Sequence, residues 1–87
     1  MNKNIIFDSN EKINKLKFLL VRFNNQVTIL LQDIDRKNEL LKVYSDDTKN
    51  ILKKEIDELK IKLNILRIKI SKLEIIIRQE ETKLKRR

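Results

Sequence analysis

Residues 52–84 read LKKEIDELKIKLNILRIKISKLEIIIRQEETKL, and this stretch decides the fold. Its apolar residues recur at steps that alternate between four and three positions: Leu52, Ile56, Leu59, Leu63, Leu66, Ile70, Leu73, Ile77 and Leu84. One slot of the series, between Ile77 and Leu84, holds the charged residue Glu80. This spacing keeps one face of an α-helix turned towards a partner helix. The segment therefore predicts a coiled-coil helix.

A second apolar set lies on nearly the opposite face of the same helix. It consists of Ile61, Ile65, Ile68 and Ile75, with Lys72 in the slot that the series skips. A helix with apolar residues on two faces needs two partners to cover them. The sequence itself supplies only one further long helix.

That other helix is predicted in the first half of the chain, over residues 11–44. The same alternation runs through Ile13, Leu16, Leu20, Phe23, Val27, Leu30, Ile34, Leu41 and Tyr44, with Lys37 in one slot. Asp8 and Glu11 have the spacing of an N-cap residue and a residue that reaches back to it. Residues 1–10 are therefore predicted to form an N-terminal arm and a helix cap.

The only interior cluster of turn-forming residues is Ser45-Asp46-Asp47-Thr48. Such side chains compete for backbone hydrogen bonds and favour a break between helices. This predicts a turn at residues 45–48 and a second helix over 49–87 with a basic C-terminal end. Because the chain contains no glycine or proline, one unbroken helix is the alternative.

An antiparallel hairpin folded between residues 46 and 47 aligns the two apolar series. The facing pairs are Leu41 with Leu52, Ile34 with Leu59, Leu30 with Leu63, Val27 with Leu66, Phe23 with Ile70, Leu20 with Leu73, and Leu16 with Ile77. The two polar slots, Lys37 and Glu80, cost stability but disfavour slipped alignments.

The charges beside these positions agree with the alignment. It brings Lys17 near Glu74 and Glu81, and Asp33 near Lys62. Exposed ion pairs are worth only about 0–1 kcal/mol each, so they select an alignment more than they stabilise it.

Length and composition favour one small domain that assembles. The chain has 87 residues, of which 39% are charged, and no cysteine for a disulfide. A chain of this size buries a limited core and often needs an oligomer. The fold class expected is all-α: an antiparallel two-helix coiled-coil hairpin that assembles into a four-helix bundle or a larger helical complex.

The composition argues against an enzyme. Histidine and cysteine are absent, which removes the usual nucleophile–base pairs, and the glycine that nucleotide and calcium loops require is absent too. We expect no catalytic residues, no cofactor and no metal site.

The function predicted is that of a non-enzymatic module for protein–protein interaction. Its partner is another copy of the chain or a different helical protein, and the predicted interface residues are Ile61, Ile65, Ile68, Ile75, Phe18 and Ile29. In the alternative interpretation, the N-terminal arm or a rotated first helix covers these isoleucines within one chain.

The net charge of +8 raises a second hypothesis, a basic hairpin that binds RNA or DNA. Its candidate phosphate contacts are Lys83, Lys85, Arg86 and Arg87. Cations at a helix C-terminus also complement the helix dipole, which alone accounts for them.

No apolar run approaches the roughly 18–20 residues of a membrane span, and the first seven residues lack the core of a signal peptide. A helix lying on a membrane surface would show one apolar and one basic face, whereas this second helix has two apolar faces. We therefore expect a soluble cytoplasmic protein.

Overall fold

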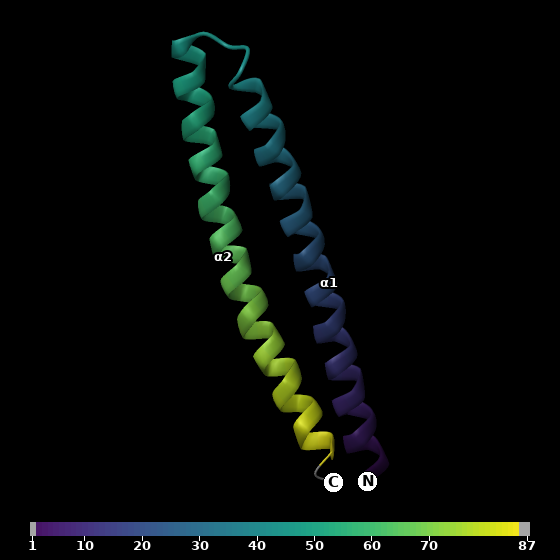
Figure 1. Ribbon diagram of the computed structural model, residues 1–87. Coiled ribbons are helices and arrows are strands. Elements are labelled where there is room, and N and C mark those ends of the chain that lie inside the picture. Colours follow the sequence, from purple (N-terminus) through teal and green to yellow (C-terminus); the bar gives the residue numbers. More distant parts are fainter. Residues whose placement is uncertain (1, 86–87) are drawn as a thin grey trace.

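The computed structural model describes residues 2–85, and it describes the surroundings of side chains for residues 10–85. Two long helices, α1 (Asn2–Leu40) and α2 (Asp46–Lys85), run antiparallel and pack along their length (Figure 1). The start of α1 and the end of α2 lie together at one end of the molecule, and the turn lies at the other. The predicted all-α hairpin is confirmed.

The hairpin is a rod with extents of 67 × 14 × 14 Å. Its radius of gyration is 19.6 Å, whereas a compact domain of this length has about 12 Å. A rod two helices wide has a single internal interface, so only the facing side of each helix is buried.

That interface is built from the predicted heptad positions. The buried side chains, between 4% and 8% exposed, are Ile13, Ile34, Leu52, Ile56, Leu63, Leu66, Leu73 and Ile77. Ile34, Ile56 and Leu63 form a cluster against which Val27, Leu30, Leu41 and Leu59 pack. Most of the buried residues belong to α2, and several core positions of α1, such as Leu20 and Phe23, are only half-buried.

The start of α1 differs from the prediction. The helix begins at Asn2, so residues 2–10 continue it instead of forming an arm with a cap at Asp8. Asp8, Ser9 and Asn10 are only modestly unfavourable inside a helix, and no glycine or proline precedes them to stop it. Adding turns to an existing helix is easier than starting one, which favours the longer helix.

The turn also lies earlier than predicted. Helix α1 ends at Leu40, and the amide groups of Lys42 and Val43 donate to carbonyls three residues back, which tightens the last turn. Tyr44, the last predicted core position of the first helix, lies in the turn with 45% of its surface exposed.

Helix α2 begins at Asp46, three residues before the predicted start at 49. The Ser45 carbonyl accepts a 2.8 Å hydrogen bond from the Lys49 amide, which makes Ser45 the capping residue. Asp46 and Asp47 then form the first turn, where negative charge is favourable beside the free amide groups. Residues 86 and 87 lie outside the described residues.

The two polar slots are matched by ion pairs between the helices. The Lys37 ammonium lies 3.5 Å from a Glu55 carboxylate oxygen, and the Lys12 ammonium lies 3.3 Å from Glu80. The predicted alignment placed Ile56 opposite Lys37 and Glu81 opposite Lys12, so both pairs agree with it to within one residue. Slipping α2 by one heptad would bring Lys62 to Lys37 in place of Glu55.

One predicted flanking pair forms and another does not. Lys17 lies 3.5 Å from Glu81, as the alignment requires. Asp33 pairs instead with Lys37 on its own helix, at 3.7 Å.

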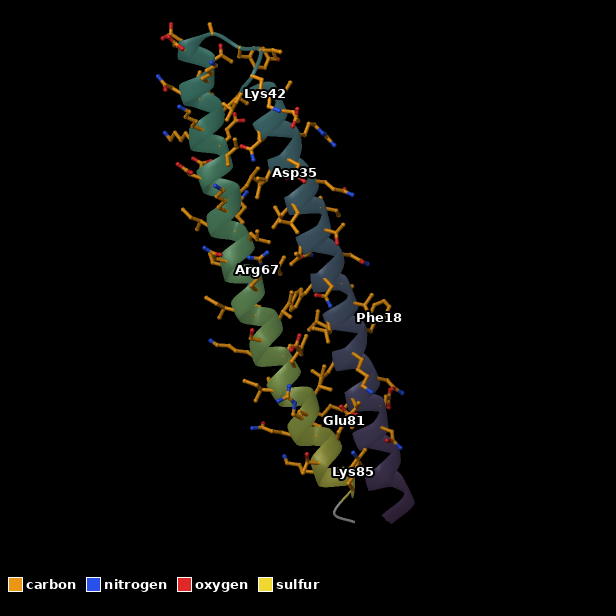
Figure 2. The ribbon with its side chains drawn as sticks, viewed as in Figure 1. Phe18, Asp35, Lys42, Arg67, Glu81 and Lys85 are labelled. Carbon is orange, nitrogen blue, oxygen red and sulfur yellow. The ribbon has the colours of Figure 1, made fainter. Side chains whose placement is uncertain are left out.

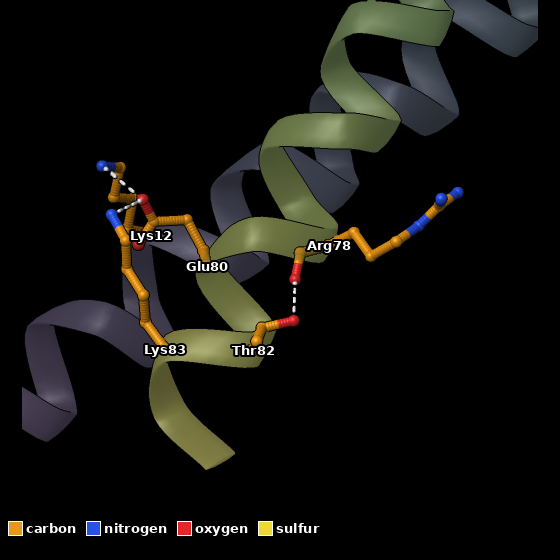
Figure 3. A network of polar contacts seen from close by, with 5 residues as sticks. All are labelled: Lys12, Arg78, Glu80, Thr82 and Lys83. Carbon is orange, nitrogen blue, oxygen red and sulfur yellow. Dashed lines mark hydrogen bonds and ion pairs between the residues drawn. The ribbon is translucent and has the colours of Figure 1, made fainter. Parts of the chain in front are cut away.

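Glu80 is the centre of a small polar network at the open end of the rod (Figure 3). Lys12 donates a hydrogen bond to it from α1, and Lys83 lies 3.5 Å away on α2. The Lys12 hydrogen bond lowers the pKa of Glu80, burial opposes this, and the charges of both lysines lower it further.

We predict that the contribution of Glu80 to stability disappears in acid. Since its pKa in the folded state lies below the ordinary 4.5, the contribution is complete above that value and is lost as the pH falls through the lowered pKa. The melting temperature of Glu80→Gln should lie below that of the native protein at neutral pH and approach it in acid. An equal difference in melting temperature between the two proteins at neutral and acid pH would contradict this role.

We also predict that Ile56→Ala, which removes the side chain at the centre of the described core, destabilises the hairpin by about 2–5 kcal/mol. Its control is Ile51→Ala on the same helix, where the side chain is 61% exposed and the expected change is within about 0.5 kcal/mol. Urea unfolding followed by circular dichroism measures both. If both variants lost the same free energy of unfolding, Ile56 would not be the more buried side chain that the structure describes.

Candidate functional site

The isoleucine stripe, which we define as Ile61, Ile65, Ile68 and Ile75, is exposed along the outer face of α2. Its members are 59%, 49%, 56% and 52% exposed respectively. Helix α1 packs against the opposite face of α2, and residues 2–10 of the predicted covering arm belong to α1. Among the residues that the structure describes, nothing from the same chain covers the stripe.

One side of the stripe is bordered by a wholly polar face of α2. Following the heptad spacing, this polar face consists of Lys53, Asp57, Lys60, Asn64, Arg67, Ser71, Glu74, Arg78, Glu81 and Lys85. All of these residues except the half-buried Glu81 are exposed. Helix α2 therefore has a core face, a polar face and the isoleucine stripe, and the stripe is an apolar row without a partner among the described residues.

The other side of the stripe opens into a shallow groove between the two helices. The groove is lined by Gln26, Ile29, Leu30, Lys62, Ile65, Leu66 and Lys69. Lysine side chains can cover apolar surface with their aliphatic stems while the ammonium groups stay in water. The hairpin thereby places Ile29 of α1 and Ile65 of α2, both predicted interface residues, at one groove.

Phe18 is not brought to this surface. It is 67% exposed and extends from the side of α1 that faces away from α2 (Figure 2). The prediction grouped it with the isoleucines because both lie outside the heptad core. Antiparallel packing through the two cores turns the outer faces of α1 and α2 in opposite directions, so one flat partner does not reach both.

Other exposed apolar residues were not among the predicted interface residues. Ile51 and Ile76 on α2 are 61% and 42% exposed, and Val43 in the turn is 76% exposed. The heptad spacing contained the signal for Ile76, because that position borders the core on the side where the groove lies.

The predicted phosphate contacts form no concentrated basic site among the described residues. Lys83 lies 3.5 Å from the Glu80 carboxylate, and Lys85 is exposed on the polar face. Thr82, which precedes Lys83, donates a 2.8 Å hydrogen bond to the Arg78 carbonyl of its own helix (Figure 3). Arg86 and Arg87 lie outside the described residues.

Residues 10–85 contain no buried polar side chain lacking a hydrogen-bond partner. Across the described part of the chain, no three acidic, histidine or cysteine side chains gather where a metal ion could bind. Neither described helix carries an apolar stretch long enough to cross a membrane.

No known family model, curated protein or solved structure matches this chain.

Proposed function

We propose that this hairpin is a non-enzymatic module for protein–protein interaction that binds through the isoleucine stripe. The observation that carries the proposal is the one-sided arrangement of α2. Four isoleucines follow one another along a face that the hairpin does not use, while the neighbouring face is entirely polar.

The energy available from covering the stripe is large for so small a chain. Complete burial of an isoleucine is worth about 1.5–3 kcal/mol, and these four are already about half covered, so the upper bound for all four is about 3–6 kcal/mol. Small domains have a total stability of only about 5–15 kcal/mol. An apolar partner surface would therefore change the stability of the hairpin appreciably.

The surface area of the rod supports the same proposal. The chain exposes 7124 Å², whereas a compact monomer of its mass exposes about 5,400 Å². The excess, about 1,700 Å², is about twice the roughly 800 Å² that each partner buries in a standard protein–protein interface. Assembly with another helical surface would remove a large part of this excess.

Binding of RNA or DNA is the second candidate, and the net charge of +8 is the observation that favours it. The two functions respond differently to salt. A complex held by phosphate contacts loses affinity steeply as salt rises, whereas an apolar interface does not. Binding to nucleic acid that survives high salt would contradict a phosphate-driven mode.

A photo-crosslinking residue in place of Ile75 tests the proposal in cells that make the protein. We expect covalent protein adducts from this position and few from the same residue in place of Asn25, an exposed position seven residues after Phe18 on the outer side of α1. Absence of adducts at Ile75, or equal adducts from both positions, would contradict binding through the stripe.

We predict that Ile65→Glu combined with Ile68→Glu abolishes those adducts and leaves the helix content nearly unchanged, because both side chains lie outside the core. The matched control is Asn25→Glu combined with Gln32→Glu, which adds the same charge to exposed positions on the outer side of α1. Circular dichroism measures the helix content of both. Unfolding of the stripe variant alone would place its isoleucines in the internal core.

A further inference from the structure

We infer that the occupant of the isoleucine stripe is a second copy of this chain, packed antiparallel through α2. The inference rests on the proposed function and names its partner. The two α2 helices lie at the centre of the resulting four-helix assembly, with an α1 helix on each outer side.

The argument comes from the residues that occupy successive slots along the stripe. From residue 58 to residue 75 these slots hold Glu58, Ile61, Ile65, Ile68, Lys72 and Ile75. Over about 26 Å of helix, the only two charged slots therefore have opposite signs. A partner must offer apolar contacts and also a positive and a negative group at matching heights.

A second α2 running in the opposite direction meets both requirements. When Ile65 of one copy faces Ile68 of the other, Ile61 faces Lys72 and Ile75 faces Glu58. These last two facing pairs follow one another along the interface, so Lys72 of one copy lies near Glu58 of the other, on the same side. Two-fold symmetry creates this ion pair twice. On one edge Asp57 also lies beside Arg78 of the second copy, whereas on the other edge Lys62 lies beside Lys69.

Other arrangements of two copies bring like charges together or lose this ion pair. A parallel pair brings Glu58 to Glu58 and Lys72 to Lys72, and like charges facing each other are destabilising. Slipping the antiparallel pair by one heptad in one direction places Lys54 against Lys72. Slipping it in the other direction places Ile61 against Gln79 and separates Lys72 from Glu58.

The polar face and Phe18 define what remains outside this interface. The polar face borders the contact and stays hydrated, as the rim of an interface does. Phe18 extends from the far side of α1, so its replacement should leave the dimer intact. Phe18 therefore provides a control variant at an apolar position that is also more than half exposed.

Sedimentation equilibrium of the purified chain over a range of micromolar concentrations tests the inference. We expect a species of twice the 10.5 kDa chain mass. Glu58→Lys or Lys72→Glu alone should weaken the dimer about tenfold, because each reverses two symmetric ion pairs. The double variant Glu58→Lys/Lys72→Glu should recover most of the affinity, and Phe18→Glu should leave it unchanged.

The failures of this inference and of the proposed function are distinguishable. A purified chain that stays monomeric throughout that range overturns the self-dimer. Protein adducts at Ile75 that contain a different protein would then still support the proposed function. A dimer that is insensitive to both single charge reversals, or one that Phe18→Glu disrupts, overturns the antiparallel alignment.

The direction of packing has an independent readout because the native chain has no cysteine. Chains carrying Ile61→Cys mixed with chains carrying Lys72→Cys should form a mixed disulfide on oxidation. Disulfides between two Ile61→Cys chains would instead indicate parallel packing and overturn the inference.

Discussion

A helix that packs against only one neighbour can bury only one of its faces. The described structure depends on this constraint, because the whole hydrophobic interior is the contact between α1 and α2. The heptad positions fill that contact, and no described side chain is completely enclosed. Apolar residues elsewhere on the rod have no interior to enter, so they remain exposed whatever their contribution to stability could be.

The constraint affects the two helices unequally. Helix α2 supplies most of the well-buried side chains and also carries the isoleucine stripe on its outer face. Helix α1 contributes two well-buried side chains and otherwise half-buried core positions, and its outer apolar residues, Phe18, Val21 and Ile29, form no continuous row. The helix that contributes more to the fold is therefore also the one with a surface suited to binding, which is why we propose it as the centre of an assembly.

Charge resolves an ambiguity that a repetitive apolar interface leaves open. Leucine and isoleucine at heptad spacing pack almost equally well when one helix slips by seven residues. Lys37 with Glu55, near the turn, and Lys12 with Glu80, near the open end, occur in one alignment only. The same reasoning applied to Glu58 and Lys72 distinguishes between arrangements of two copies on the outer face of α2.

Local spacing by itself determined the two helices, their antiparallel alignment and the apolar set on the outer face of α2, because heptad periodicity records which residues share a face. It did not determine where the helices begin and end. Asp8 has the features of a helix cap, yet α1 continues to Asn2, since a weak preference for a helix end does not stop a helix that can continue. Only the tertiary structure decided which outer residues lie together. Packing core against core joined Ile29 to Ile65 at one groove and turned Phe18 away, and no spacing within a single helix contains that relation.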